Sequence, residues 1–207
     1  MSATVSPVST LVTTERLVVR DWEPSDVAAA LAVFGDDRVA RWLAPAAEAV
    51  ADESEMLELF EAWEREQVRQ DGDLEQFVGR WALARKDDGV VVGALVLRTM
   101  PPHDADLEIA WQLAPEHWGH SYASEGVRGL AAWAFEQGAA EVFAVIRPGN
   151  ERAEWIARRL GMEWVGETDK YYDLHLRAFR LRPSDLAPPD PVTTGMIPVV
   201  RATPPPA

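Results

Sequence analysis

Residues 107–137 hold the pattern that most restricts how this chain can fold: a short apolar run, a turn around one glycine, and an amphipathic helix. The run Leu107–Leu113 predicts a strand, and Pro115 must end it because proline cannot donate to a sheet ladder. From Tyr122 the apolar residues follow a helical period, at Val127, Leu130, Ala131 and Ala134. The turn around Gly119 would therefore expose free N–H groups at a helix N-terminus, where the helix dipole is positive. This arrangement suits a phosphate, although a plain structural connection has the same pattern.

The residues of the turn narrow this choice. The segment PEHWGHSYASE, residues 115–125, resembles P-E-x-W-G-x-G-x-A-[ST]-E of the Gcn5-related N-acetyltransferases (GNAT), specifically the RimJ/RimL-type group that acetylates protein N-termini and small amines. In that family a [QR]-x-x-G-x-[GA] turn holds the pyrophosphate of acetyl-CoA. Two of the three matching positions depart from the pattern. Glu116 replaces Gln or Arg, and Ser121 replaces a small residue with one that can cap the helix N-terminus.

Two further segments match in the family's order. T-E-R-L-x-x-R begins at Thr14, and N-x-x-A-x-x-x-A-x-x-L-G-M runs from Asn150 to Met162. The resemblance spans residues 11–182 and implies a single-domain α/β fold, with a mixed, mostly antiparallel twisted sheet and helices on both faces. We expect residues 1–10 to be a flexible N-terminus. Residues 183–207 should form a Pro-rich C-terminal tail.

The order of elements supports the same architecture. Strands are predicted at residues 11–20, 77–85, 90–98, 107–113, 141–147, 162–167 and 174–182, and helices at 27–34, 48–75, 122–137 and 151–160. Residues 39–43 form a turn or a short helical piece. Hairpins come first, then a strand–helix–strand crossover and a closing pair, which indicates one mixed α/β sheet.

Composition excludes several kinds of protein. With no cysteine there is no thiolate nucleophile, so the acyl group of an acyltransferase could not pass through an enzyme cysteine. The predicted route is direct attack by the acceptor in a ternary complex. A net charge of −14 argues against nucleic acid and against anionic membranes. No signal peptide or membrane-length apolar run is evident, so we expect a cytoplasmic protein. His117 and His120 lack a third ligand nearby, and we expect no metal.

The resemblance implies acetyl-CoA as the cosubstrate and a set of residues around it. The residues expected to contact acetyl-CoA are Leu113, Trp118, Gly119, His120, Ser121, Tyr122, Ala123, Ser124 and Asn150. Glu108 is the candidate general base, because an alkyl ammonium must lose a proton before its nitrogen can attack. It could instead be a polar residue on the solvent face of its strand.

The group that protonates the departing thiolate is not evident. Family members often carry a Tyr or a Ser in the helix after Asn150, but the matching positions here are Ala157 and Ala153. Tyr171 and Tyr172 could supply the proton, although core packing is the other explanation for both.

Two segments bear on partners. Residues 48–75 hold eleven Asp/Glu against two Arg and predict an amphipathic helix that could attract a cationic amine acceptor. A solvated face that only aids solubility is the alternative. Residues 187–207 hold 7 of the 15 prolines and could dock on a partner or on a second copy, so a homodimer is an option.

Four tryptophans, Trp42, Trp63, Trp111 and Trp118, could line the acceptor pocket. The predicted function is acetyl transfer to a primary amine, either a protein N-terminus or a small cationic amine. A non-catalytic CoA- or acyl-CoA-binding module of the same fold is the alternative.

Overall fold

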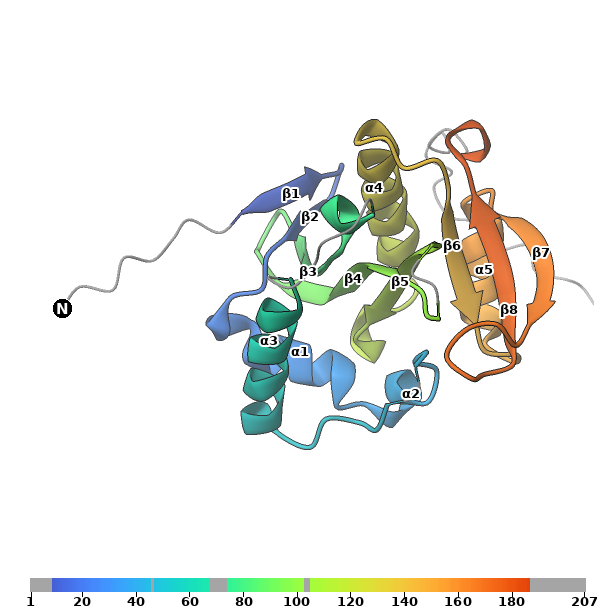
Figure 1. Cartoon of the computed structure of the whole chain (residues 1–207). Coiled ribbons are helices and arrows are strands. Elements are labelled where there is room, and N and C mark those ends of the chain that lie inside the picture. Colours follow the sequence, from blue (N-terminus) through green and yellow to red (C-terminus); the bar gives the residue numbers. More distant parts are fainter. Residues whose placement is uncertain (1–8, 46, 68–73, 103–104, 187–207) are drawn as a thin grey trace, which may run out of the picture.

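The computed structural model describes residues 9–45, 47–67, 74–102 and 105–186, and its centre is one eight-stranded sheet (Figure 1). The strands run in the order β1-β2-β3-β4-β5-β6-β8-β7, and all neighbours are antiparallel except β5 and β6. Their bounds are Thr10–Thr13, Leu17–Arg20, Gly79–Arg85, Val91–Thr99, Leu107–Leu113, Val142–Ile146, Glu163–Thr168 and Leu176–Leu181 for β1 to β8. The predicted mixed, mostly antiparallel α/β fold is confirmed.

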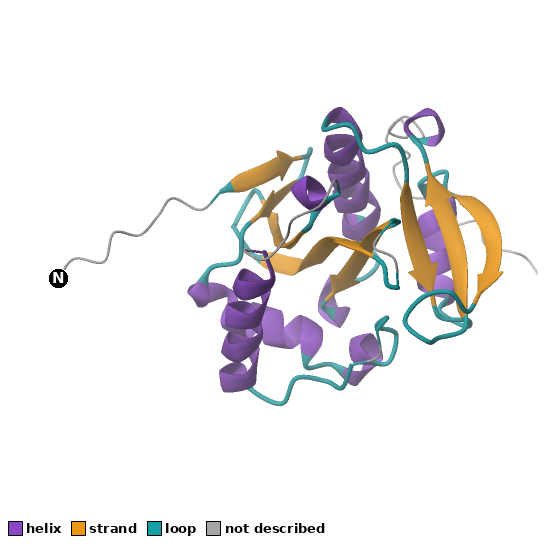
Figure 2. Cartoon of the chain, viewed as in Figure 1, coloured by secondary structure: helices purple, strands orange, loops and turns teal. Residues whose placement is uncertain are grey.

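Helices cover both faces of this sheet (Figure 2). The α-helices α1 to α5 are Val27–Phe34, Asp37–Ala40, Glu53–Gln67, Tyr122–Glu136 and Glu151–Arg159. Helices α4 and α5 pack in the main core on one face, and α1 and α3 enclose a second apolar cluster on the other. No helix in the described residues is long and apolar enough to cross a membrane.

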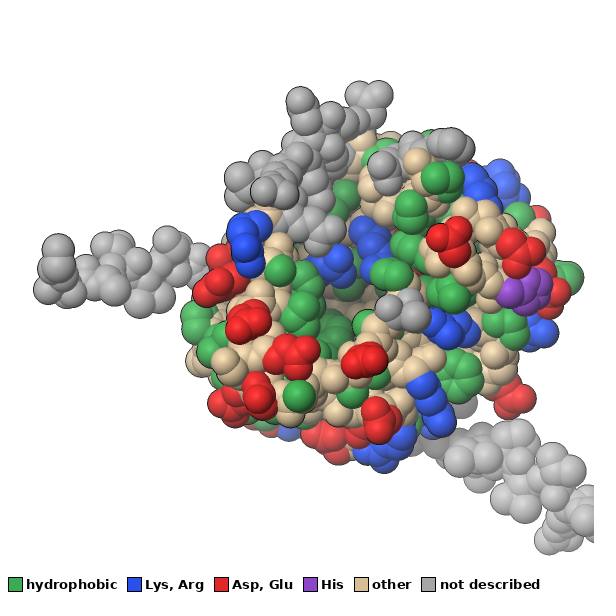
Figure 3. Space-filling view, turned by 60° about the horizontal axis from the view of Figure 1, so that its bottom comes forward, with side chains coloured by type: hydrophobic (Ala, Val, Ile, Leu, Met, Phe, Trp, Pro, Cys, Tyr) green, Lys and Arg blue, Asp and Glu red, His purple; other side chains and the backbone are tan. Residues whose placement is uncertain are grey.

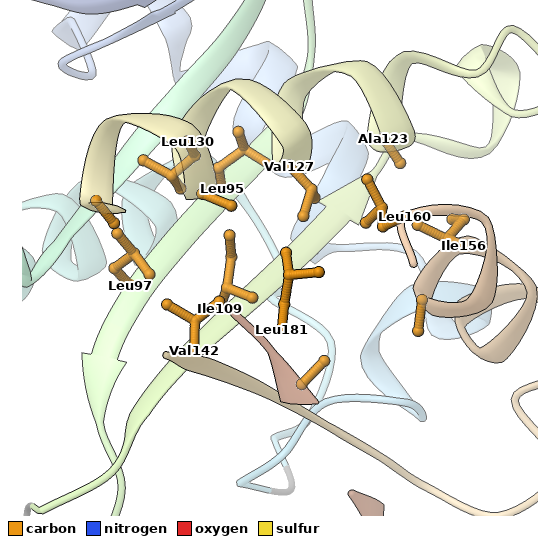
Figure 4. Packing of buried hydrophobic residues seen from close by; sticks show 14 of the residues in the cluster. Leu95, Leu97, Ile109, Ala123, Val127, Leu130, Val142, Ile156, Leu160 and Leu181 are labelled. Carbon is orange, nitrogen blue, oxygen red and sulfur yellow. The ribbon is translucent and has the colours of Figure 1, made fainter. Parts of the chain in front are cut away.

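The main core forms where the apolar stripe of α4 meets the inward side chains of the strands (Figure 4). Val127 and Leu130 of α4 contact this layer and are fully buried, as are Leu95 of β4 and Ile109 of β5. Each such side chain contributes about 1.5–3 kcal/mol relative to an exposed one. The predicted period of the segment after the turn therefore gave the correct buried face.

Gly126 lets α4 lie close to the sheet. A Cβ added at this glycine would come within 2.9 Å of Leu83 Cδ1 and 3.3 Å of Leu95 Cδ1. Packing against the sheet therefore explains this helical glycine without a ligand.

Several predicted elements differ from those in the structure. Residues 11–20 form two strands, because Thr14 turns the chain by accepting the N–H of Leu17 on its side-chain oxygen. Of the predicted helix 48–75, Glu53–Gln67 is helical and residues 68–73 lie outside the described part. Of the predicted strand 174–182, Leu176–Leu181 is a strand, and His175 lies just before it and is exposed. Residues 1–8 and 187–207, on which the terminal predictions rest, also lie outside the described residues.

Candidate active site

The sheet opens between its two parallel strands. In register, β5 and β6 pair at Glu108 with Phe143, whereas β5 stays paired with β4 along its whole length. Beyond that pair the two strands separate, and a cleft of about 600 Å³ lies between them. The lining comes from residues 108–113 of β5, 144–146 of β6, 117–119 and 121–124 around the start of α4, 149–153, 155 and 156 around the start of α5, and 38, 39 and 41–44.

The glycine turn forms a cradle at one wall of this cleft. Gly119 has a φ of 87°, Ser121 has a φ of 61°, and both line the cleft. Within the described part of the chain, no group accepts a hydrogen bond from the backbone N–H groups of residues 119–124. Six successive free amides at the N-terminus of a 15-residue helix are a suitable site for a phosphate anion.

Ser121 does not cap the helix with its side chain, contrary to expectation. A side-chain cap requires an extended backbone at the capping residue, and Ser121 is left-handed instead. His120 lies on the turn but does not line the cleft, since its ring stacks on Tyr122 at 5.3 Å between centroids.

A clamp from the start of the chain holds this turn. Glu125 of α4 accepts hydrogen bonds from the Thr14 hydroxyl at 2.6 Å and from the Arg16 backbone N–H at 2.7 Å. The Arg16 guanidinium binds the same carboxylate at 2.7 Å and donates to the His120 carbonyl at 3.1 Å. The first and second matched sequence segments, more than 100 residues apart, therefore form one unit.

Hydrogen bonding dominates the ionisation of Glu125. Burial alone would raise the pKa of this carboxyl, but the hydrogen bonds from Thr14 and from the Arg16 backbone and side chain lower the pKa overall. The carboxylate is thus held in its charged form, as the clamp requires.

Leu113, Trp118 and Asn150 line the cleft and also hold its walls together. The Trp118 indole N–H donates to the Leu113 carbonyl at 2.9 Å, and the Arg152 guanidinium stacks 3.7 Å from the Trp118 ring. Asn150 Oδ1 caps α5 by accepting the Ala153 N–H at 3.2 Å. No sequence pattern predicted the Trp118–Leu113 bond, which depends on the shape of the turn.

Two polar atoms of the lining have no partner among the described residues. Gln112 Oε1 and Ser124 Oγ are buried and make no hydrogen bond. Buried polar groups are normally satisfied, so these atoms fit a polar ligand in the cleft. Together with the free amides of the turn, they make the lining compatible with a cosubstrate that carries phosphates and amide groups.

Glu108 lies at the inner end of the cleft with 2 % of its side chain exposed, so it is not on a solvent face. Its Oε2 accepts hydrogen bonds from Arg98 Nε at 2.7 Å and from the Tyr172 hydroxyl at 2.5 Å. Its Oε1 accepts none from the described residues. One carboxylate oxygen is therefore fixed and the other remains available.

Arginines also bind the loop that closes this end. Arg98 donates to the Ala44 carbonyl, and Arg147 of the β6 end donates to the Leu43 carbonyl at 2.9 Å. Burial alone would lower the pKa of Arg98, but Glu108 and Tyr172 raise the pKa overall. Burial and the Glu108 charge raise the pKa of Tyr172 above its usual range.

The other residues considered as site candidates divide into those that line the cleft and those that lie elsewhere. Ala157 is fully buried in the core, and Tyr171 bonds to Asp106 at 2.8 Å rather than to Glu108. Trp42, Trp111 and Trp118 line the cleft, whereas Trp63 packs in the second cluster against Phe34 and Phe60. No group of three potential metal ligands occurs in the described ranges.

Sequence reasoning missed part of the lining. Arg38, Arg41, Arg152 and Trp155 also line the cleft. Trp155 is 54 % exposed, and its place among charged residues on a helix was a usable signal. No sequence signal pointed to the three arginines, because their positions depend on how the segments around residues 38–44 and 149–156 meet.

The acidic side chains of α3 face solvent rather than the cleft. Glu53, Glu55, Glu58, Glu61 and Glu64 are exposed, and no described residue of α3 lines the cleft. Figure 3 shows acidic side chains gathered on the side of the molecule where α3 lies, beside a hollow in this face. Any influence of α3 on an acceptor would therefore act over a distance.

Comparison with known proteins decides the family. The sequence profile of the acetyltransferase (GNAT) domain matches residues 16–163. The chain belongs to the GNAT acetyltransferase family. It is therefore an acyltransferase, and acetylation with acetyl-CoA is the family's activity.

Individual relatives are more distant. YoaA of Bacillus subtilis (strain 168), an uncharacterised N-acetyltransferase, is 24 % identical over 160 residues, or 76 % of this chain and 85 % of YoaA. The ribosomal L7/L12 alpha-N-protein acetyltransferase RimL superposes with a TM-score of 0.67 at 15 % identity, covering 88 % of this chain and 98 % of RimL. This similarity shows that the two proteins share a fold. RimL has also been solved with coenzyme A, and that structure superposes with a TM-score of 0.65 at 13 % identity, covering 84 % and 98 %.

The same fold also serves other acceptors. FdhC, a nucleotide-linked sugar GNAT, superposes with a TM-score of 0.64 at 14 % identity, covering 84 % of this chain and 91 % of FdhC. The fold therefore does not identify the acceptor.

Proposed function

We propose that this protein transfers an acetyl group from acetyl-CoA to a primary amine by direct attack in a ternary complex. The observation that carries the proposal is that one cleft contains both six free backbone amides at residues 119–124 and a buried carboxylate with one available oxygen, Glu108. Acetyl-CoA supplies an acetyl group activated as a thioester. The chain supplies binding, orientation and a proton acceptor.

Each part of the cleft has a role in this proposal. The amides of the turn would hold the pyrophosphate, with Gly119 leaving room for the approach. Gln112 and Ser124 offer unpartnered polar atoms to the amide groups of the pantetheine arm. Leu113, Trp118, Tyr122, Ala123 and Asn150 would form the surrounding contacts. Oε1 of Glu108 would take a proton from the ammonium, while Arg98 keeps the carboxylate in place.

The test is CoA release with a panel of amines, using wild type and Glu108→Gln. We expect the substitution to lower kcat by about 10²–10⁴-fold, the usual contribution of a positioned base, with little change in CoA affinity. Full turnover by Glu108→Gln on the best acceptor would place the base elsewhere. Tight CoA binding with no turnover on any amine would favour the non-catalytic binding module.

For the acceptor we propose a cationic amine, either a basic protein N-terminus or a small polyamine-like compound. The exposed acidic face of α3 supports this, because a concentrated negative field raises the encounter rate with cations. Such attraction weakens as salt screens it. The proposal predicts that kcat/KM for matched cationic and neutral amines differs at low salt and converges as salt rises. Preference for an anionic amine, in keeping with Arg38 and Arg41 in the cleft lining, would contradict it.

A further inference from the structure

Arg152 and Trp155 lie at the open end of the cleft, away from the buried carboxylate of Glu108. Both side chains line the cleft, and both are exposed. They come from the first two turns of α5, and residues three apart share a face of a helix. Another face of α5 is anchored, because Ile156 and Ala157 are buried in the main core. The two side chains therefore form one rim of the cleft on a fixed element.

Arg152 brings a positive charge to the glycine turn. Its guanidinium carbon lies 3.7 Å from the ring centroid of Trp118, the residue directly before Gly119. Arg38 also approaches this ring, at 5.8 Å, but Asp36 binds the Arg38 guanidinium at 2.6 Å. Arg152 forms no ion pair with a carboxylate of the described ranges. A guanidinium stacked through its face keeps the N–H groups in its plane, and these suit a phosphate.

Trp155 is a large aromatic side chain in contact with solvent at the same rim. It is 54 % exposed although it lines the cleft. Arg159, one turn further along α5, lies 5.1 Å from the centroid of its ring and restrains the indole. Exposed aromatic rings at the edge of a binding groove serve as platforms on which flat bases stack. Trp155 therefore suits a purine ring.

The covalent order of CoA determines which of its parts can reach this rim. The thiol arm, the pyrophosphate and the adenosine 3′-phosphate follow one another in the molecule. With the pyrophosphate on the amides of residues 119–124 and the thioester near Glu108, the adenosine must extend from the turn toward the open end. Arg152 supplies a cation there, and Trp155 supplies an aromatic surface.

We propose that Arg152 and Trp155 form the subsite for the adenosine 3′-phosphate end of CoA. Trp155 stacks on the adenine, and Arg152 pairs with the 3′-phosphate. This inference rests on the proposed function, which puts the pyrophosphate at the turn. The consequence is a choice of donor: free acetyl-CoA is preferred over an acetyl group on phosphopantetheine alone, such as that of a carrier protein, which has neither adenine nor 3′-phosphate.

Three ligands separate the parts of this subsite by calorimetry: CoA, dephospho-CoA without the 3′-phosphate, and 4′-phosphopantetheine without the adenosine. Wild type should bind CoA about tenfold more tightly than dephospho-CoA, the effect of one charge-assisted contact at an exposed site. Arg152→Gln should raise the Kd for CoA about tenfold and change that for dephospho-CoA less than about threefold. Arg152→Lys keeps the charge and should retain part of the difference.

Trp155→Leu tests the adenine contact. It should raise the Kd for CoA and for dephospho-CoA about tenfold each, and change the Kd for 4′-phosphopantetheine less than about twofold. Because both side chains are exposed, the free energy of unfolding should stay close to that of wild type.

Each substitution has a matched control. Trp164 on β7 is 57 % exposed, much like Trp155, but it does not line the cleft, so Trp164→Leu should leave all three affinities unchanged. Arg38 lies on the same indole as Arg152 but is bound by Asp36. Arg38→Gln should therefore preserve the difference between CoA and dephospho-CoA.

Four results would overturn the inference. These are equal wild-type affinities for CoA and dephospho-CoA, an Arg152→Gln protein that keeps their difference, a Trp155→Leu protein that binds CoA like wild type, and a Trp155→Leu protein that loses 4′-phosphopantetheine affinity equally. The proposed function stands under each of them. It fails instead if the wild type releases no CoA with any amine.

Discussion

Glu125 should determine how well the glycine turn around Gly119 is ordered before a ligand binds. Glu125→Gln tests this with the smallest change in side-chain shape. In the clamp, Oε1 accepts from the Thr14 hydroxyl and the Arg16 N–H, and Oε2 faces the Arg16 guanidinium. Glutamine can keep the first two bonds with its carbonyl oxygen. Its NH₂ group would then face the Arg16 guanidinium. Because both groups are hydrogen-bond donors, no hydrogen bond can form between them.

The expected magnitude follows from this geometry. A hydrogen bond to a charged group contributes about 1.5–3 kcal/mol when it is buried. The Arg16 side chain is 47 % exposed, so solvent screening reduces the loss to about 1 kcal/mol. Once released from Glu125, Arg16 also loses its hold on the His120 carbonyl. The turn must then be ordered when the ligand binds, and we expect the Kd for CoA to rise about 5–10-fold.

The assay is calorimetry with CoA, together with denaturant unfolding. Glu154→Gln is the matched control, because Glu154 is also a buried helix carboxylate and bonds to Arg177 at 2.7 Å away from the turn. It should lose comparable stability and keep its CoA affinity. The reasoning is refuted if Glu125→Gln binds CoA as tightly as wild type, or if Glu154→Gln weakens CoA binding equally.

Two further predictions concern the same turn. Gly119→Ala should bind CoA at least tenfold more weakly by calorimetry. Alanine at a φ of 87° is strained by about 1–2 kcal/mol, and its Cβ would occupy the open space beside the amides. A normal Kd would show that no phosphate approaches there. The pKa of Glu125 is lowered from its usual 4.5, so its stabilisation is complete above that value and is lost as pH falls through the folded-state pKa. The difference in unfolding free energy between wild type and Glu125→Gln should accordingly stay constant from about pH 8 to 5.5 and shrink in more acidic solution; a difference that shrinks already near neutral pH would contradict the assigned contacts.

The local pattern of the chain predicted the centre of the fold well. The strand β5, the turn at Gly119 and the helix α4 follow from residue period and from Pro115, which act within a few residues. The split between β1 and β2 was missed because it depends on a turn made by the Thr14 side chain inside a β-branched run.

The candidate site could be predicted only in part. Glu108 was predicted as a candidate base because a carboxylate inside an apolar strand is unusual. Its hydrogen-bond partners come from elsewhere in the chain. Arg98 meets Glu108 through the register of β4 and β5, which the sequence around the loop between them does not determine. Tyr172 reaches the same carboxylate from 64 residues away, through the left-handed turn before β8.

The narrow pairing of β5 with β6 also bears on how the molecule responds to stress. The strands on either side belong to two groups, β1 to β5 and β6 to β8, each paired extensively within itself. At the seam between them the sheet has one registered pair, reinforced on the cleft side by Arg98 and Arg147 holding the loop at Leu43 and Ala44. Backbone pairing across this seam is therefore sparse, and the two groups are held together mainly by the main core, which takes buried side chains from both. A ligand spanning the cleft would join them, and substrate binding would then also act as mechanical reinforcement of the whole domain.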